Sequence, residues 1–270
     1  KDDGLNNDNS VSERVIAVVI ARMASSRLPN KAIIKINQVP AINRCINATS
    51  ASSKISDIIF ATSKNQEDDL LAKMAGKVID IYRGSDDDPG LRIYEASLKK
   101  NAKHIIRVTG DTPLILPDLL DELINSHLIT KSDYSFIQDA PLGVSAEIFT
   151  IESLGYILNN YETKGNSEYL SLFFKNNKKI FKINNYSSKL VDINSINYRF
   201  NLDYPEDHEV IDKLFKLKKD KSTPFYSNEL FEISAKNPKL MALNSNMEKK
   251  YEQKKLKEHL LSITTTRVNK

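Results

Sequence analysis

Four short segments rich in Ile, Val and Ala recur through the first half of the chain, in alternation with helical patterns. The apolar segments cover residues 14–21, 54–63, 78–85 and 104–113, and the helical patterns cover 41–50, 66–77, 91–102 and 117–129. A continuous β-branched run is typical of a strand that is buried on both faces of a parallel sheet. Strands that alternate with helices predict an α/β fold with right-handed crossovers.

The second half of the chain has a weaker pattern. Strands are predicted at 133–137, 146–151 and 179–184, some of them antiparallel, and 200–217 has the pattern of a strand end, a turn and a helix. We expect a polar, disordered leader over residues 1–12, one domain over 13–247 and a charged helical tail over 248–270.

Composition excludes several classes of protein. No apolar run approaches the roughly 18–20 residues of a membrane helix, so no membrane association is expected. The 39 basic and 35 acidic residues leave a weak net charge of +4, concentrated near the C-terminus. A solvated helix face explains that bias better than a nucleic-acid surface, so no nucleic-acid partner is expected. Cys45 is the single cysteine, which rules out an internal disulfide and agrees with a reducing, cytoplasmic location.

The loop after the first predicted strand carries three cations and two hydroxyls, and ligands of parallel sheets bind at the carboxyl ends of strands. These residues are Arg22, Ser25, Ser26, Arg27 and Lys31. Such a set at a strand-to-helix turn suits a polyphosphate. An ordinary solvated loop is the competing interpretation. The segment has no GxxxxGK[ST] motif and no GxGxxG motif, so neither a P-loop nor a Rossmann dinucleotide site is expected.

Two aspartates follow the ends of other predicted strands. Asp111 comes after Gly110, and Asp203 ends a predicted strand late in the chain. A Gly-Asp pair also makes ordinary turns. Glu206 and Asp207 suit the start of a helix, whereas Asp203 has no such role. If Asp203 faces Asp111, the two carboxylates could hold Mg²⁺ together with phosphate oxygens and water.

These segments resemble motifs of the cytidylyltransferases that make CMP-sugars. The matching stretches are RMASSRLPNK at 22–31, YRGSDDD at 82–88, RVTGDTPLI at 107–115 and NLDYPEDHEVI at 201–211. The greatest resemblance is to the SpsF-like group of spore coat polysaccharide biosynthesis, which is related to the 3-deoxy-manno-octulosonate and acylneuraminate cytidylyltransferases. The resemblance covers about residues 14–247.

The resemblance implies a nucleotide-diphospho-sugar transferase-like fold, a three-layer α/β/α sandwich with a mostly parallel mixed sheet. It implies an enzyme that couples CTP to a sugar or sugar acid, with Mg²⁺ as cofactor, and releases a CMP-sugar and pyrophosphate for a surface polysaccharide or glycan. A homodimer is also expected. By matching positions, the catalytic residues are Arg22, Lys31 and Asp111, and the metal ligands are Asp111 and Asp203. The nucleotide-binding residues are Arg22, Ser25, Ser26, Arg27, Lys31, Arg83, Ser85 and Arg107.

The acceptor side departs from the family pattern. Glu147 matches the family, but Ser145 and Tyr169 stand where an Asp and a His are usual. We therefore expect Ser145, Glu147 and Tyr169 to contact an acceptor that differs from the usual one. Two alternatives stay open. The same fold could use a phosphonate, a polyol phosphate or another nucleoside triphosphate, or the chain could be a non-catalytic nucleotide-binding domain of a longer protein.

Overall fold

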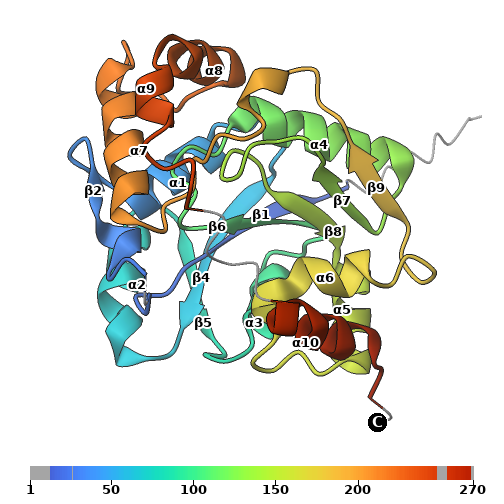
Figure 1. The fold of residues 1–270 in the computed structure, drawn as a ribbon. Helices are drawn as coiled ribbons and strands as arrows, with labels where there is room; N and C mark the ends of the chain where they lie inside the picture. The colour runs from blue at the N-terminus through green and yellow to red at the C-terminus, as the bar shows by residue number, and fades with distance from the viewer. Residues whose placement is uncertain (1–12, 26, 248–253, 269–270) are drawn as a thin grey trace, which may run out of the picture.

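A seven-stranded sheet forms the centre of the molecule in a computed structural model, which describes residues 13–25, 27–247 and 254–268 (Figure 1). The strand order is β5-β4-β1-β6-β8-β7-β9. The strands are β1 (Val15–Ile20), β4 (Asp57–Ser63), β5 (Asp80–Gly84), β6 (His104–Thr109), β7 (Tyr134–Ile137), β8 (Glu147–Thr150) and β9 (Ile183–Tyr186). Strands β5, β4, β1 and β6 are parallel, and β8 is antiparallel to both of its neighbours. This confirms the predicted mostly parallel mixed sheet.

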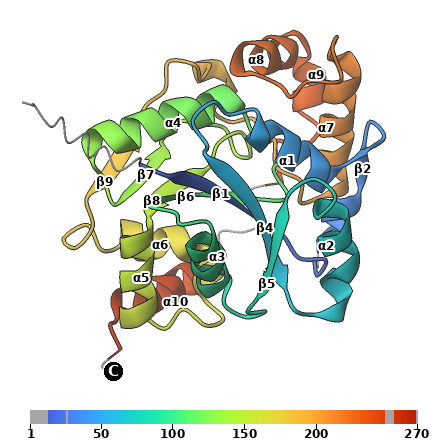
Figure 2. The same cartoon turned by 180° about the vertical axis from the view of Figure 1, so that it is seen from behind.

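Helices cover both faces of the sheet (Figures 1 and 2). One core contains residues of α1 (Ala41–Ser50), α2 (Asp69–Ala75), α4 (Pro117–Thr130), α7 (Pro205–Leu217), α8 (Ser227–Lys236) and α9 (Pro238–Met241). The other contains residues of α3 (Pro89–Lys99), α5 (Ile151–Asn160) and α6 (Leu170–Lys175), and α10 (Lys254–Thr265) packs on α6.

Strand β1 shows why the fold needs two helical layers. Val15, Ala17 and Val19 belong to one core, and Ile16 and Val18 belong to the other. Successive side chains of a strand point to opposite faces, so a continuous apolar run must be covered on both sides. The three-layer α/β/α arrangement follows from this pattern.

Parts of the chain differ from the predictions. Residues 200–203 do not end a strand, because the backbone there contacts two loops instead: Phe200 N–H donates to the Leu142 carbonyl and Leu202 N–H to the Asp111 carbonyl, each at 2.8 Å. The sequence did not predict a hairpin of β2 (Lys35–Ile36) and β3 (Val39–Pro40). It also did not predict helices α5, α6, α8 and α9 or four 3-10 turns among the described residues. Strand β9 lies slightly later than the predicted 179–184.

The ends of the chain are described only in part. The predicted leader over residues 1–12 lies outside the described residues, as does the first part of the tail at 248–253. Helix α10 covers Lys254–Thr265 of the predicted tail, and residues 269–270 also lie outside the described residues. Within the described parts, none of the helices combines the length and apolar character that a membrane span needs.

Candidate active site

A cavity of about 510 Å³ opens at the carboxyl ends of β1 and β6. It is lined by Ile20, Ala21, Arg22, Ala24, Ser25, Arg27, Lys31, Ala32, Pro89, Arg92, Arg107, Thr109, Gly110, Asp111, Glu168 and Tyr169. Four separate segments therefore meet here: the loop after β1, the start of α3, strand β6 with its following loop, and the turn that precedes α6. The position agrees with the rule that open α/β sheets bind ligands outside the carboxyl ends of their strands.

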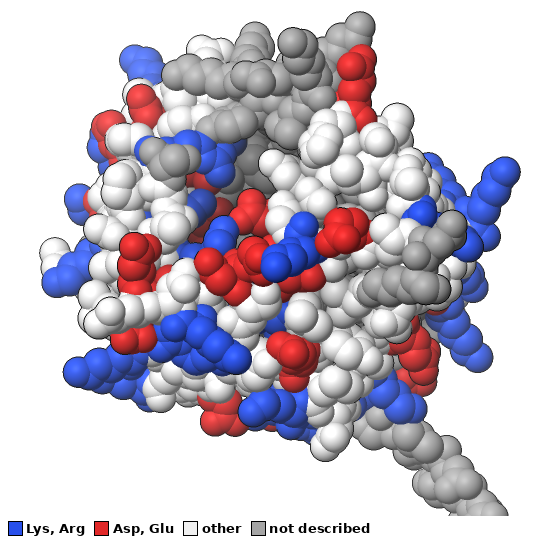
Figure 3. Space-filling view, turned by 90° about the horizontal axis from the view of Figure 1, so that it is seen from below, with Lys and Arg blue, Asp and Glu red and all other residues white. Residues whose placement is uncertain are grey.

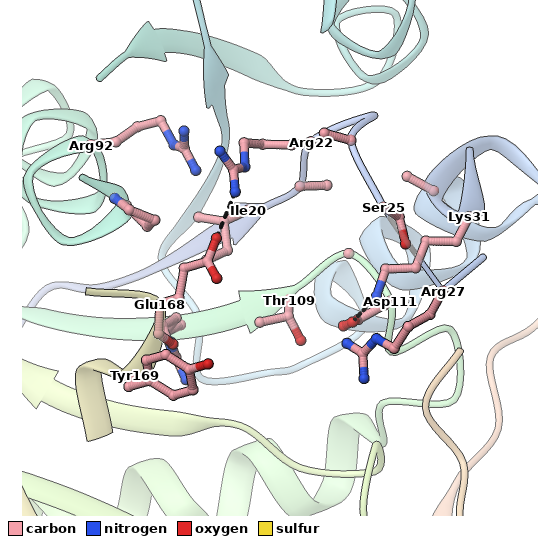
Figure 4. A pocket seen from close by; sticks show the side chains of 16 residues that line it. Ile20, Arg22, Ser25, Arg27, Lys31, Arg92, Thr109, Asp111, Glu168 and Tyr169 are labelled. Atoms are coloured by element: carbon pink, nitrogen blue, oxygen red, sulfur yellow. Dashed lines mark hydrogen bonds and ion pairs between the residues drawn. The ribbon is translucent and has the colours of Figure 1, made fainter. Parts of the chain in front are cut away.

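Lys31 lies at one end of this cavity (Figure 4). Its Nζ donates to Asp111 Oδ2 at 2.6 Å and to Asp203 Oδ1 at 2.8 Å. Burial alone would lower the pKa of Lys31, but the charges of the two aspartates outweigh it, and the pKa is raised. The side chain is therefore a fixed ammonium donor at neutral pH.

The backbone explains why two aspartates that are far apart in sequence meet at one lysine. The Leu202 N–H donates to the Asp111 carbonyl, which joins the two loops directly. Gly110 allows the loop after β6 to lie against the end of β1, because a Cβ there would approach Ala21 Cβ to 2.7 Å. Asp111 and Asp203 therefore meet at the Lys31 ammonium, and the predicted Mg²⁺ between them stays a prediction.

Asp203 is the most strongly paired carboxylate of this cluster. Besides Lys31, it contacts Arg27 at 3.0 Å and Arg199 at 2.9 Å, and it accepts a hydrogen bond from Asn201. Burial opposes ionisation, but the surrounding cations outweigh burial and lower the pKa of Asp203. Asp203 is thus an anion in the free protein.

The donor set at Asp111 and Asp203 fits Mg²⁺. Both groups offer hard carboxylate oxygens that meet at one cation, the ammonium of Lys31. Among the described residues, no group of three or more His, Cys, Asp or Glu side chains could hold a metal ion. Mg²⁺ is commonly bound by one or two carboxylates plus water and substrate phosphates, so two aspartates are enough. A divalent ion held by both would take the place that the Lys31 ammonium has in the free protein.

The other end of the cavity holds a second set of ion pairs. Arg22 Nη2 donates to Glu168 Oε1 at 2.5 Å, and Arg22 Nη1 donates to the Asp86 carbonyl at 3.0 Å. Arg107 pairs with Glu147 at 2.9 Å, and Glu147 also accepts from the Tyr134 hydroxyl at 2.7 Å. Acidic and basic side chains also lie intermingled across the middle of the face that Figure 3 shows, and not as a basic stripe.

The structure brings most of the predicted residues to the cavity. Those that line it are Arg22, Ser25, Arg27, Lys31, Arg107, Asp111 and Tyr169. Asp203 and Glu147 reach it through their ion pairs with lining residues. Ser26 lies outside the described residues.

Three other predicted residues neither line the cavity nor form an ion pair with a residue that lines it. Arg83 extends from β5 toward the end of β4 and the loop after it, where it donates to the carbonyls of Ser63 and Asn65. Ser85 is used within its own loop, because its Oγ accepts from the Asp88 N–H. The Ser145 hydroxyl donates to the Ala146 carbonyl at 3.4 Å, and Ser145 is not among the residues that line this cavity.

Asp88 holds together two segments that form one wall of the cavity. It accepts hydrogen bonds from the Leu91 N–H at the start of α3 and from the hydroxyls of Thr163 and Ser167, the latter two at 2.6 Å. Asp88 thus caps α3 and ties the start of this helix to the segment that carries Glu168.

Arg92 was missed by sequence reasoning. It is 2% exposed and lines the cavity, although it lies within the helical pattern of α3. The sequence signal that could have revealed Arg92 is its position in the first turn of a helix that follows a strand-end loop.

Comparisons with known proteins identify the family of the chain. A family profile described as Cytidylyltransferase matches residues 16–252. The chain is 27% identical over 238 residues to the spore coat polysaccharide biosynthesis protein SpsF of Bacillus subtilis, covering 83% of this chain and 95% of SpsF.

Two solved structures share the fold. A cytidylyltransferase from Leptospira borgpetersenii superposes with a TM-score of 0.78 at 24% identity, over 85% of this chain and 97% of that one. A CMP:2-keto-3-deoxy-manno-octonic acid synthetase in complex with CTP superposes with a TM-score of 0.57 at 16% identity, over 76% and 99%. The family profile spans nearly all of the α/β domain and the whole cavity wall, so the chain belongs to the cytidylyltransferase family and is a nucleotidyltransferase.

Proposed function

We propose that this enzyme couples CTP to a sugar or sugar acid and releases a CMP-sugar and pyrophosphate, for a surface polysaccharide or another glycan. The observation that carries the proposal is the cluster of Lys31, Arg27, Asp111 and Asp203, in a cavity that three further arginines line. A set of fixed cations beside two metal-competent carboxylates suits a triphosphate better than a neutral ligand. Similarity to SpsF and to a CMP-sugar-acid synthetase supports the acceptor class.

The reaction needs positioning more than covalent chemistry. An acceptor hydroxyl attacks the α-phosphorus in line, a new oxygen–phosphorus bond forms, the bond to the β-phosphate oxygen breaks, and the hydroxyl proton leaves to water. Lys31 and Arg27 hold the phosphates and neutralise the charge that develops on pyrophosphate. Arg22, which the resemblance also assigned to the nucleotide, lies at the other end of the cavity and pairs with Glu168. Asp111 and Asp203 would hold Mg²⁺, which would supply charge neutralisation and make the acceptor hydroxyl easier to deprotonate.

The proposal is tested by mass-resolved product analysis. Purified enzyme with Mg²⁺ is incubated with CTP, UTP, GTP or ATP and with acceptors that carry a carboxylate, a phosphate or neither. Pyrophosphate release is measured alongside, with and without EDTA. We expect a cytidylylated sugar or sugar acid with CTP and no product in EDTA. A product only with another nucleotide, or only with a polyol phosphate or phosphonate, would overturn the proposal.

A further inference from the structure

Arg92 differs from every other arginine that lines the cavity. Arg22, Arg27 and Arg107 each have a carboxylate partner within ion-pair distance. Arg92 has none within 4.0 Å among the described residues, although it is 2% exposed. Its Nη1 donates to the Ser85 carbonyl at 2.8 Å, and its Nε is buried without an acceptor. The edge formed by Nε and Nη2 is therefore unused.

The surroundings of the Arg92 guanidinium increase the free-energy cost of burying its charge. Burial lowers the pKa of Arg92, and the nearby charge of Arg22 lowers it further, while Asp68, Asp86 and Glu168 act in the opposite sense. A buried charge without a hydrogen-bonded counter-ion is unfavourable, and the penalty is relieved by an anion. An arginine edge with two parallel N–H groups matches the two oxygens of a carboxylate or a phosphate.

Burial alone does not account for the position of Arg92. Arg44 on α1 is also buried, at 9% exposed, and its Nε also lacks an acceptor. However, Arg44 lies over the Phe215 ring at 4.1 Å and donates to backbone carbonyls, away from the cavity. Arg92 is thus a buried cation that lines the cavity and has no carboxylate within ion-pair distance among the described residues.

The position within the cavity indicates which substrate supplies the anion. Figure 4 shows Arg92, Arg22, Glu168 and Tyr169 on one side of the cavity, with Lys31 and Asp111 on the other. If the triphosphate binds at the Lys31 end, an anion at Arg92 comes from the second substrate.

We propose that Arg92 binds an anionic group of the acceptor, a carboxylate or a phosphate, and so selects acidic acceptors over neutral ones. The inference rests on the proposed function for the identity of the other substrate. Glu168 does not oppose such an anion strongly, because its carboxylate is paired with Arg22.

The test uses Arg92→Met, which removes the charge, and Arg92→Lys, which keeps the charge but loses the two-donor edge. Arg44→Met is the matched control, because it removes a buried arginine outside the cavity. Three acceptor probes are compared: 3-deoxy-manno-octulosonate for a carboxylate, ribitol 5-phosphate for a phosphate, and mannose as a neutral sugar. Steady-state constants for CTP and acceptor are measured, and calorimetry follows binding of each probe in the absence of turnover.

We expect Arg92→Met to raise the acceptor KM for one anionic probe by about 10- to 100-fold, with Arg92→Lys intermediate and the CTP KM within about twofold. The probe affected identifies carboxylate or phosphate as the group bound. A rise in the CTP KM alone, an equal loss for charged and neutral probes, or the same effect in Arg44→Met would overturn the inference. If the wild-type enzyme binds an anionic probe but forms no product with CTP, the proposed function fails. The calorimetric comparison then still tests Arg92, because Arg92→Met should lose that binding. Absence of binding to all anionic probes also overturns the inference.

Discussion

Replacing Lys31 by Met should separate catalysis from stability at the Asp111–Asp203 cluster. The side chain of Lys31 is 16% exposed and donates two charge-assisted hydrogen bonds, at 2.6 and 2.8 Å. Hydrogen bonds to charged groups contribute about 1.5–3 kcal/mol each. The loss here should be smaller than their sum, because Asp203 keeps Arg27 and Arg199 as partners. We expect the free energy of unfolding to fall by about 2–3 kcal/mol, below the ~3–5 kcal/mol of a fully unpaired buried charge.

Turnover should fall much more steeply than stability. Loss of one fixed donor to the charge that develops in the transition state typically lowers kcat by about 10²–10³. The assay is pyrophosphate release at saturating CTP, with urea unfolding measured on the same preparation. Lys218→Met is the matched control, because Lys218 is also buried and pairs with Glu229 at 2.7 Å, outside the cavity.

The Lys218→Met control distinguishes a loss of catalysis from a loss of folding stability. Lys218→Met should lose comparable stability and keep its turnover. If Lys31→Met retains turnover within about threefold of wild type, the phosphate role of Lys31 is wrong, because that loss is far below the expected effect. Equal losses of turnover in both variants would show that the effect comes from folding alone.

Four further results are expected. Burial would raise the pKa of Asp203, but neighbouring cations outweigh burial and lower it. The Asp203 carboxylate therefore contributes to stability above its ordinary pKa of 3.8, and this contribution is lost as the pH falls below that value. Urea titrations should thus show that the difference in unfolding free energy between wild type and Asp203→Asn becomes smaller below that pH. Burial, with the charge of a neighbouring histidine, lowers the pKa of His127 from 6.5 to about 3, so the folded state should lose stability as the pH falls from 6.5 toward 3, and His127→Gln should flatten that part of the profile. Asp88→Ala should cost about 1–2 kcal/mol through the lost cap and raise the acceptor KM more than the CTP KM. Tyr169→His should shift the ranking of acceptors, whereas Ser145→Asp should not, because only Tyr169 lines the cavity; the reverse result in a competition assay would contradict this assignment.

The strands that carry the site could be predicted because the residues of each strand themselves show that it is buried on both faces. A run such as Val15–Ile20 has no polar face, so it must be covered on both sides, and the loop after it must lie at the ligand edge of a parallel sheet. Asp111 follows the end of β6 and obeys the same rule, whereas Asp203 lies in a loop that does not end a strand. The strand ends thus locate the part of the site that the loops after β1 and β6 form.

Other features depend on tertiary contacts that no local pattern contains. Helix α5 begins at Ile151, directly after β8 ends at Thr150, so no loop signal separates the two elements. Arg83 was assigned to the nucleotide by its match to a family motif, and in the structure it donates to the backbone at the end of β4 and after it. Arg92 was missed, because a helical pattern concealed a residue that lines the cavity.

The pairing of charges along the cavity has a consequence for how substrates enter. Lys31 and Arg27 already have carboxylate partners in the free protein, so an incoming phosphate must compete with Asp111 and Asp203 for them. A bare triphosphate would leave Asp111 without the Lys31 ammonium and Asp203 paired with Arg199, with the negative charge of the triphosphate beside both. If a divalent ion arrives with the triphosphate, as proposed, the two aspartates would hold it, and Lys31 would be released to the phosphates. We therefore expect the free cavity to bind a metal-bound nucleotide in preference to the free one, which would account for carboxylates beside a site for a polyanion.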